Sequence, residues 1–200
     1  KPQSHLAVLR GNLAPDGAVA KISGKEGLRF EGRAKAFDSE HLALRAILDG
    51  RVVAGDVVVI RYEGPKGAPG MPEWGQLPIP QKLLKQGVRD MVRISDARMS
   101  GTSYGACILH ASPESYIGGP LALVKTGDLI TIDVPNRKIH LEISDEELNQ
   151  RKAKWIAPEP KYERGYGWMF SRHILQAEDG CDFDFLETSF GKPVPEPDIF

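Results

Sequence analysis

Short apolar runs separated by turn residues open the chain. Three of them mix apolar and polar residues in the manner of β-strands: HLAVLR (5–10), AVAKIS (18–23) and LRFEGRAKAF (28–37). Glycines and a Pro-Asp-Gly sequence lie among these runs, as expected of turns that connect strands. The first part of the chain therefore predicts several short strands.

A helical pattern follows in SEHLALRAILD, Ser39–Asp49. Leu42, Ala46 and Ile47 recur at a spacing that places them on one face of a helix. Ser39 can cap the free N–H groups of the first turn, and a glycine follows the last residue, where helices commonly end. Strands combined with this helix indicate the α+β class.

Two glycine-rich segments each follow a predicted strand. Asp56–Arg61 (DVVVIR) is a continuous β-branched run, typical of a strand covered on both faces and central in a sheet. Tyr62–Gly75 comes next, with four glycines and three prolines in 14 residues. A short helix within residues 79–87 and a strand at 91–95 lead to a second such turn, Asp96–Gly105. We expect both loops at neighbouring places on the sheet, as candidate sites.

The second half of the chain is rich in strand patterns. LALV at 121–124 predicts a strand, and DLITIDV (128–134) and KIHLEI (138–143) predict a hairpin joined by Pro-Asn-Arg. Ser144–Glu147 has the spacing of a capping box and predicts a helix that runs to about Trp155. We therefore assign residues 1–155 to one domain.

Residues 156–200 differ in composition, being rich in aromatic residues and glycine and ending in a proline-rich stretch. An isolated domain rarely exposes so many aromatic side chains. We expect this segment to be a C-terminal extension that packs on another domain or subunit.

Composition excludes several classes of function. The 26 basic and 27 acidic residues give no broad basic field, which argues against nucleic acid as a partner. No apolar run approaches the roughly 20 residues of a spanning helix, so a membrane partner is not expected. Cys107 and Cys181 lie 74 positions apart, which suits a reducing cytoplasm and supplies too few thiols for an iron–sulfur cluster. The five histidines show no spacing typical of zinc ligands.

Glu73 ends the first glycine-rich loop. Prolines stiffen this loop, and glycines allow its backbone to approach a ligand closely. Mg²⁺ prefers oxygen ligands held at about 2.1 Å, so a carboxylate on a stiff loop suits it. By residue pattern alone, a solvated glutamate at a loop tip is the commoner case.

Ser100 lies in the second loop, RMSGTSYG, after a predicted strand and beside two glycines. A serine presented by such a turn can act as a base or nucleophile where a cation or a histidine lowers its pKa or takes its proton. A turn-stabilising or helix-capping hydroxyl is the commoner reading of the pattern. The sequence is not G-x-S-x-G, so it does not indicate a hydrolase.

Both loops resemble signature segments of the dihydroxy-acid/6-phosphogluconate dehydratase family. These segments are RYEGPKGAPGMPE (Arg61–Glu73) and SDARMSGTSYG (Ser95–Gly105), and the elements HASPES, GGPLALV and GDLITI follow in the family's order. The resemblance extends from Gly11 to about Trp155. The aromatic ending resembles the sugar-acid branch, such as arabinonate or xylonate dehydratases.

The resemblance implies a fold and a set of roles. It implies an α+β domain of the swivelling β/β/α type, built around a β-barrel-like sheet with flanking helices and a C-terminal helical extension. It makes Glu73 a Mg²⁺ ligand, Ser100 the base that removes the C2 proton, and Thr102 a residue that lines the substrate pocket. An iron of an iron–sulfur cluster, acting as a Lewis acid, then takes the C3 hydroxyl. The resulting enol tautomerises to a 2-keto-3-deoxy acid.

The remaining parts of that site are expected elsewhere in a longer protein. The resemblance implies an N-terminal cluster-binding domain of the same protein, a sugar-acid substrate and a homo-oligomer, dimer or tetramer. These 200 residues alone should therefore be inactive. Two alternatives stay open: the dihydroxy-acid dehydratase of branched-chain amino acid synthesis, and a non-catalytic binding or assembly module.

Overall fold

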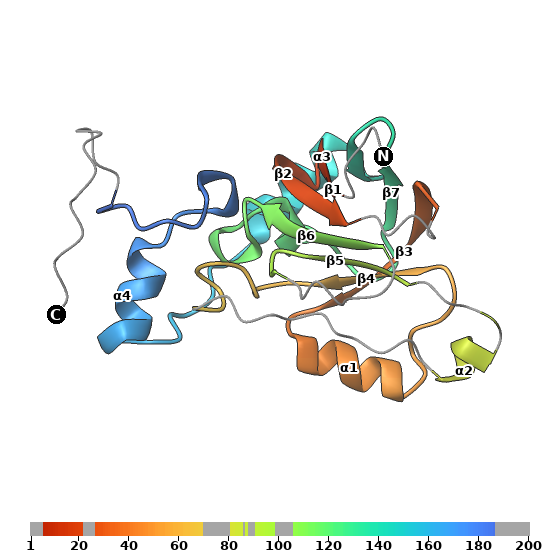
Figure 1. Cartoon of the computed structure of the whole chain (residues 1–200), viewed down its shortest axis with the longest axis horizontal. Helices are drawn as coiled ribbons and strands as arrows, with labels where there is room; N and C mark the ends of the chain where they lie inside the picture. The colour runs from red at the N-terminus through yellow and green to blue at the C-terminus, as the bar shows by residue number, and fades with distance from the viewer. Residues whose placement is uncertain are drawn as a thin grey trace, which may run out of the picture.

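Eight strands close into a single mixed barrel in the computed structural model of the chain (Figure 1). The structure describes residues 6–21, 27–69, 81–85, 87, 91–98 and 106–186. The order around the barrel is β1-β2-β6-β5-β4-β3-β7-β8. The strands are β1 (Leu6–Gly11), β2 (Ala14–Lys21), β3 (Arg29–Phe37), β4 (Asp56–Ile60), β5 (Val92–Ser95), β6 (Cys107–Ser112), β7 (Leu129–Asp133) and β8 (Lys138–Leu141). The α+β, barrel-like prediction is confirmed.

Helices and 3₁₀ turns lie outside the barrel. They are α1 (Glu40–Leu48), α2 (Gln81–Lys85), α3 (Asp145–Lys154), α4 (Gly165–His173), η1 (Ser115–Ile117), η2 (Pro120–Leu123) and η3 (Ala177–Asp179). In the part of the chain that the structure describes, none of the helices has the length and apolar character needed to cross a bilayer.

The four neighbouring strands β3, β4, β5 and β6 run parallel to one another. Ile60, the last residue of β4, pairs in register with Ser95, the last residue of β5. Parallel strands end at the same edge of a sheet. The segments that follow β4, β5 and β6 therefore leave the barrel at one end.

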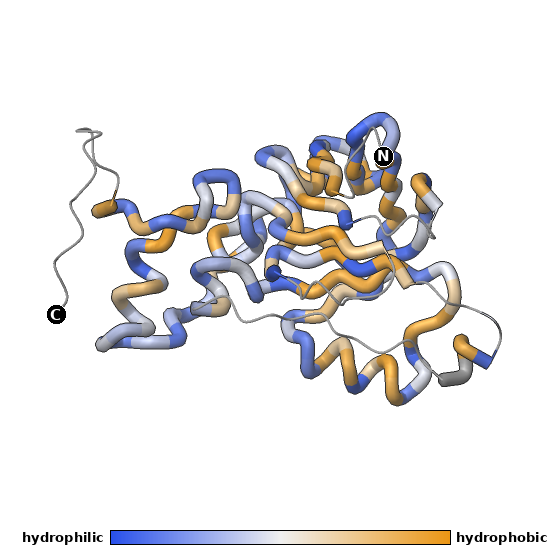
Figure 2. The backbone as a smooth tube through the Cα atoms, viewed as in Figure 1, coloured by the Kyte–Doolittle hydropathy of each residue, from blue (hydrophilic) through white to orange (hydrophobic). Residues whose placement is uncertain are grey.

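β4 is buried on both faces, as its β-branched sequence predicts. Val57 and Val59 point into the barrel core, whereas Val58 and Ile60 belong to a second cluster between the outside of the barrel and α1. Figure 2 shows the matching band of hydrophobic residues along the central strands. This double burial places β4 between the barrel core and α1.

α1 is capped as its sequence predicts, because the Ser39 hydroxyl accepts a hydrogen bond from the Leu42 N–H group. Its buried face consists of Ala43, Ala46 and Ile47. Leu42, which we expected on that face, is 49% exposed. Ala43 takes its place because it lies one turn before Ile47, on the side that faces β4.

The hairpin and the helix after it form as predicted. β7 and β8 pair antiparallel, and Ser144 caps α3 by accepting the Glu147 N–H group. The expected strand at 121–124 is wrong: residues 120–123 form the 3₁₀ turn η2. Pro120 occupies the first turn of η2 after an extended Gly119, and the side chains of 121–123 are all buried, so the apolar run reflects burial rather than strand pairing.

The C-terminal extension forms a unit beside the barrel rather than part of it (Figure 1). α4 has no buried residue, and the segment after η3 folds back on it, where Phe183 pairs with Ile174 and the Asp184 N–H group donates to the His173 carbonyl oxygen. Phe183 packs edge-on against Phe170 of α4 at 5.4 Å between ring centroids and stacks on Phe185 at 5.2 Å. Tyr166 remains 69% exposed and Phe185 55% exposed. The extension therefore exposes aromatic surface.

Candidate functional site

The two signature segments leave the barrel side by side. Residues 61–69 follow β4 and residues 96–98 follow β5, and these strands are adjacent and parallel. Glu73, Ser100 and Thr102, the site residues expected from the sequence, lie outside the described residues. The described parts of both segments show how their starting points are fixed.

Asp96 joins the segments that follow three strands. Its carboxylate accepts the Glu63 N–H group after β4 at 3.1 Å and the Ser115 N–H group after β6 at 2.8 Å. The side chain is 1% exposed. Burial raises the pKa of Asp96, and the hydrogen bonds from Ser115 and Glu63 oppose that rise. A buried carboxylate that accepts two backbone N–H groups fixes both segments relative to β5.

Glu114 binds the backbone of the first signature loop. Its Oε1 atom accepts the Lys66 N–H group at 2.9 Å, and its Oε2 atom accepts the Gly67 N–H group at 2.9 Å. Burial raises the pKa of Glu114, while hydrogen bonds from Gln176, Gly67 and Lys66 counteract it. Buried N–H groups need partners, and Glu114 supplies them where no strand neighbour can.

Close packing requires glycine at two positions of this loop. A Cβ atom on Gly64 would lie 2.7 Å from Oε2 of Glu114, and one on Gly67 would lie 2.7 Å from the Tyr62 carbonyl oxygen. Tyr62 itself has a positive φ of 64°, so the chain turns sharply as it leaves β4. The GPKG sequence thus allows the loop to lie directly on Glu114.

Glu63 connects the loop to α1. Its Oε1 atom accepts the Glu40 N–H group at the start of that helix, at 3.3 Å. Burial raises the pKa of Glu63, and the Glu40 N–H group lowers it. A carboxylate at a helix N-terminus is stabilised by the helix dipole. The loop is therefore held at both Glu63 and Lys66.

The C-terminal extension also contacts this end of the barrel. Lys66 Nζ donates to the carbonyl oxygens of Ser171 and Arg172, in the last turn of α4, at 3.2 and 3.4 Å. The Ser112 hydroxyl donates to the Glu178 carboxylate. The first signature loop therefore lies between the barrel and the extension.

A pocket of about 360 Å³ lies beside the exit of β4. Arg61 and Arg151 contribute to its lining, together with Lys125 and Trp155. Arg61 pairs with Asp38 and also donates to the carbonyl oxygens of residues 122 and 124, and Arg151 pairs with Asp128 and with Glu147. Both guanidinium groups therefore hold η2 and α3 in place.

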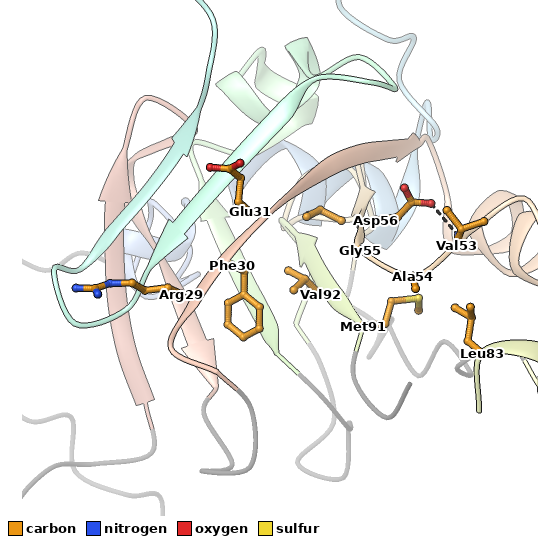
Figure 3. Close-up of a pocket in the computed structure, with 11 residues that line it drawn as sticks. Arg29, Phe30, Glu31, Val53, Ala54, Gly55, Asp56, Leu83, Met91 and Val92 are labelled. Carbon is orange, nitrogen blue, oxygen red and sulfur yellow. Dashed lines mark hydrogen bonds between the residues drawn. The ribbon is translucent and has the colours of Figure 1, made fainter. Parts of the chain in front are cut away.

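A second pocket, of about 280 Å³, lies at the opposite end of the sheet (Figure 3). Gly55, Asp56 and Val92 line it where β4 and β5 begin, and the Asp56 carboxylate accepts the Val53 N–H group at 2.8 Å. A strand of five residues spans roughly 16 Å. This pocket is therefore separate from the end at which the signature loops leave.

The chain's own residues do not fit an iron–sulfur cluster. Its two cysteines are Cys107, buried in β6, and Cys181, half-buried in the extension. A cluster generally needs three or four protein ligands. Among the described residues, no three His, Cys, Asp or Glu side chains gather as metal ligands. Any cluster would need ligands from outside these 200 residues.

Sequence reasoning missed the three buried carboxylates. Glu63, Asp96 and Glu114 lie inside or beside the signature segments, and none was singled out from the sequence. A signal was present, because Asp96 directly follows the last residue of a buried strand. Acidic residues at that position are well placed to bind the N–H groups of neighbouring loops.

Comparison with known proteins identifies relatives over nearly the whole chain. The family model described as dihydroxy-acid/6-phosphogluconate dehydratase C-terminal matches residues 1–181. The 6-deoxy-6-sulfo-D-gluconate dehydratase of Pseudomonas putida is 51% identical over 198 residues, which is 97% of this chain and 34% of that protein.

Relatives of two substrate types occur. A dihydroxy-acid dehydratase of Synechococcus sp. (strain JA-2-3B'a(2-13)) is 55% identical over 184 residues, 92% of this chain and 32% of the relative. An L-arabinonate dehydratase of Rhizobium leguminosarum bv. trifolii is 48% identical over 193 residues, 94% of this chain and 33% of the relative. The chain spans about a third of the length of these curated relatives.

Proposed function

We propose that the longer parent protein dehydrates a sugar acid to a 2-keto-3-deoxy acid. The premise is that this chain belongs to the dihydroxy-acid/6-phosphogluconate dehydratase family, whose C-terminal domain it matches. The observation that carries the proposal is the parallel pairing of β4 and β5, which starts both signature segments at one edge of the sheet. The relatives are named dehydratases, so the reaction class follows from the family.

The sugar-acid branch is favoured by how far each match extends. The sulfogluconate and arabinonate dehydratases match over 198 and 193 residues, and the dihydroxy-acid dehydratase matches over 184. The aromatic-rich end of the sequence also resembles that of the sugar-acid branch. We therefore assign an aldonate, such as L-arabinonate, D-xylonate or a 6-substituted gluconate, as the substrate class.

Within that reaction we assign Ser100 as the base, Glu73 as a magnesium ligand and Thr102 as a residue that contacts the substrate. Ser100 Oγ, as an alkoxide, takes the proton from C2. The C3–O bond breaks, the departing hydroxide takes up the proton that Ser100 removed and leaves as water, and the resulting enol tautomerises to the 2-keto acid. A proton alpha to a carboxylate is weakly acidic, so the developing enolate needs a nearby cation.

The described residues support these roles by holding the loop backbones. Asp96 connects the segments after β4, β5 and β6, and Glu114 binds the loop that continues toward Glu73. Catalysis of this kind depends on rigid placement of base and cation, because an error of about 1 Å can cost a hundredfold in rate. Neither Asp96 nor Glu114 needs to touch the substrate for that purpose.

Magnesium and an iron–sulfur cluster are proposed as cofactors of the parent protein. Bound magnesium would stabilise negative charge on the substrate, and a cluster iron would act as a Lewis acid toward the leaving hydroxyl. We place the cluster ligands and the other magnesium ligands in an N-terminal domain of the same protein, which would act in the cytoplasm. The aromatic extension then packs on that domain or on a second subunit of a homo-oligomer.

Dihydroxy-acid dehydration is the second candidate, favoured by the 55% identity to the Synechococcus enzyme. The two candidates separate in one assay of the full-length protein, with magnesium and a reconstituted cluster, against L-arabinonate, D-xylonate, 6-deoxy-6-sulfogluconate and a branched 2,3-dihydroxy acid. We expect 2-keto acid from an aldonate. Turnover of the branched acid alone would select the alternative, and turnover of none would favour a binding or assembly module.

A further inference from the structure

Glu114 and Gln176 form a reciprocal pair of hydrogen bonds between the barrel and the C-terminal extension. Gln176 Nε2 donates to Glu114 Oε1 at 2.7 Å, and the Glu114 N–H group donates to Gln176 Oε1 at 2.9 Å. Both polar atoms of the Gln176 amide are therefore engaged by one residue. The pair joins residues that are 62 positions apart.

The same carboxylate holds the first signature loop. Gly67 donates to Oε2, and Lys66 donates to both oxygens, at 2.9 Å to Oε1 and 3.1 Å to Oε2. Glu114 is 1% exposed, so water does not compete for these bonds. Its two oxygens thus accept three N–H donors, two from the loop backbone and one from the extension.

Lys66 makes a second, independent connection between loop and extension. Its Nζ atom donates to the Ser171 and Arg172 carbonyl oxygens. These are carbonyls of the last turn of α4, where a positive charge interacts favourably with the helix dipole. The extension therefore contacts the loop through its helix end and through Gln176.

We propose that Glu114 and Gln176 are positioning residues that lock loop 61–69 to the C-terminal extension, so that the extension sets the placement of the loop bearing Glu73. Glu73 lies seven residues beyond Lys66 in the sequence. The catalytic consequence rests on the proposed dehydratase function, but the lock itself does not. The extension is then a working part of the site, in addition to any surface it offers to another domain.

Hydrogen exchange in the full-length protein tests the lock without reference to activity. Glu114→Gln keeps the size of the side chain but replaces one acceptor oxygen with an NH2 group, which can only donate. Amide exchange at Lys66 and Gly67 should accelerate by roughly tenfold to a hundredfold, because bonds to a charged acceptor are lost. Glu142→Gln, the same change at an exposed glutamate, should leave exchange at both amides unchanged. Unaltered exchange in Glu114→Gln would overturn the lock.

A double variant in which the two side chains are exchanged controls for misfolding of the single variants. Gln176→Glu alone places two carboxylates together and should also accelerate exchange of the loop amides. The double variant Glu114→Gln/Gln176→Glu restores a donor opposite an acceptor and should recover most of the protection on a logarithmic scale. A double variant no better than the worse single variant would contradict the proposed coupling.

Kinetics then separate positioning from a merely structural role. Glu114→Gln should lower kcat by roughly tenfold to a hundredfold while KM stays within about threefold, since the loop is misplaced rather than the substrate released. The double variant should regain much of the lost kcat. An unchanged kcat alongside faster loop exchange would overturn the positioning role. Should the wild-type protein dehydrate no sugar acid, the exchange measurement still decides the lock.

Discussion

Ile60 and Ser95 end two neighbouring parallel strands and pair with each other in register. One signature segment begins directly after Ile60 and the other begins with Ser95 itself, so both start about one strand spacing apart, at roughly 4.8 Å. Buried carboxylates then fix the directions of the segments: Asp96 connects them to β6, and Glu114 binds the first of them. The end of the barrel formed by these strand exits is therefore the place where the proposed chemistry should occur.

Glu73→Gln in the full-length protein should lower magnesium occupancy and dehydration together, because the amide keeps the shape but loses the charge that a hard cation needs. We expect the magnesium concentration that gives half-maximal activity to rise at least tenfold. Metal titration of activity measures it, with Glu142→Gln, at an exposed position, as the matched control. Unchanged magnesium affinity would refute the ligand role.

Asp96→Asn should destabilise the domain by about 2 kcal/mol, since one of two N–H groups would face an amide donor instead of an oxygen. It should also slow turnover, because the segments that follow β4, β5 and β6 lose the carboxylate that joins them. Denaturant unfolding measures the stability. Asp16→Asn, at an exposed aspartate of β2, should change it little. Equal stabilities of the two variants would contradict the anchoring role.

Gly119→Ala should cost about 3 kcal/mol or more, because the new Cβ would lie 1.8 Å from the Pro113 carbonyl oxygen. Backbone must move to relieve that contact, and the Glu114 carbonyl oxygen, 2.7 Å from the same Cβ position, would move with it. Thermal unfolding provides the measurement. Gly27→Ala is the control, since its nearest neighbour would be 3.7 Å away. A stable Gly119→Ala protein would show that this turn tolerates more rearrangement than its packing indicates.

The pairing of Asp128 with Arg151 should make stability depend on pH. Desolvation tends to raise the pKa of Asp128, but hydrogen bonds from Arg151 and the Lys125 N–H group outweigh it and lower the pKa below the ordinary value of 3.8. A carboxyl with a lowered pKa stabilises the fold above its unfolded pKa, and that contribution disappears as pH falls through the folded value.

Asp128→Asn should accordingly cost about 1 to 3 kcal/mol near neutral pH, since both side chains are about nine-tenths buried. The difference from wild type should shrink below pH 3.8. Urea unfolding at several pH values tests this, with Asp145→Asn at an exposed position of α3 as the comparison. A difference that is independent of pH would contradict the ion-pair account.

Much of the barrel follows from local patterns, and the exceptions have physical causes. The β-branched run of β4 and the capping serines of α1 and α3 predicted those elements directly. Residues 121–124 have the apolar pattern of a buried strand, but Pro120 directs them into a 3₁₀ turn. β6 was not predicted, because its residues 107–112 include cysteine, histidine and serine, and the last three begin the HASPES motif.

The sequence predicted only part of the candidate site. Spacing identified the two loops, and their adjacency follows from the parallel pairing of β4 and β5. The sequence could not predict that Glu114 binds the first signature loop and the extension. Its partners Lys66 and Gln176 lie 48 and 62 residues away and become neighbours only in the fold. Long-range contacts of this kind carry no local periodicity.

Ser100→Ala in the full-length protein, assayed for aldonate dehydration with magnesium and a loaded cluster, tests the central claim most directly. The control is Ser144→Ala, which removes a helix cap and should cost about 1 kcal/mol of stability without affecting turnover. The account predicts that Ser100→Ala folds, keeps its cluster and loses at least a thousandfold in kcat, roughly the upper part of the range for a general base. Turnover retained with a normal cluster content would contradict it.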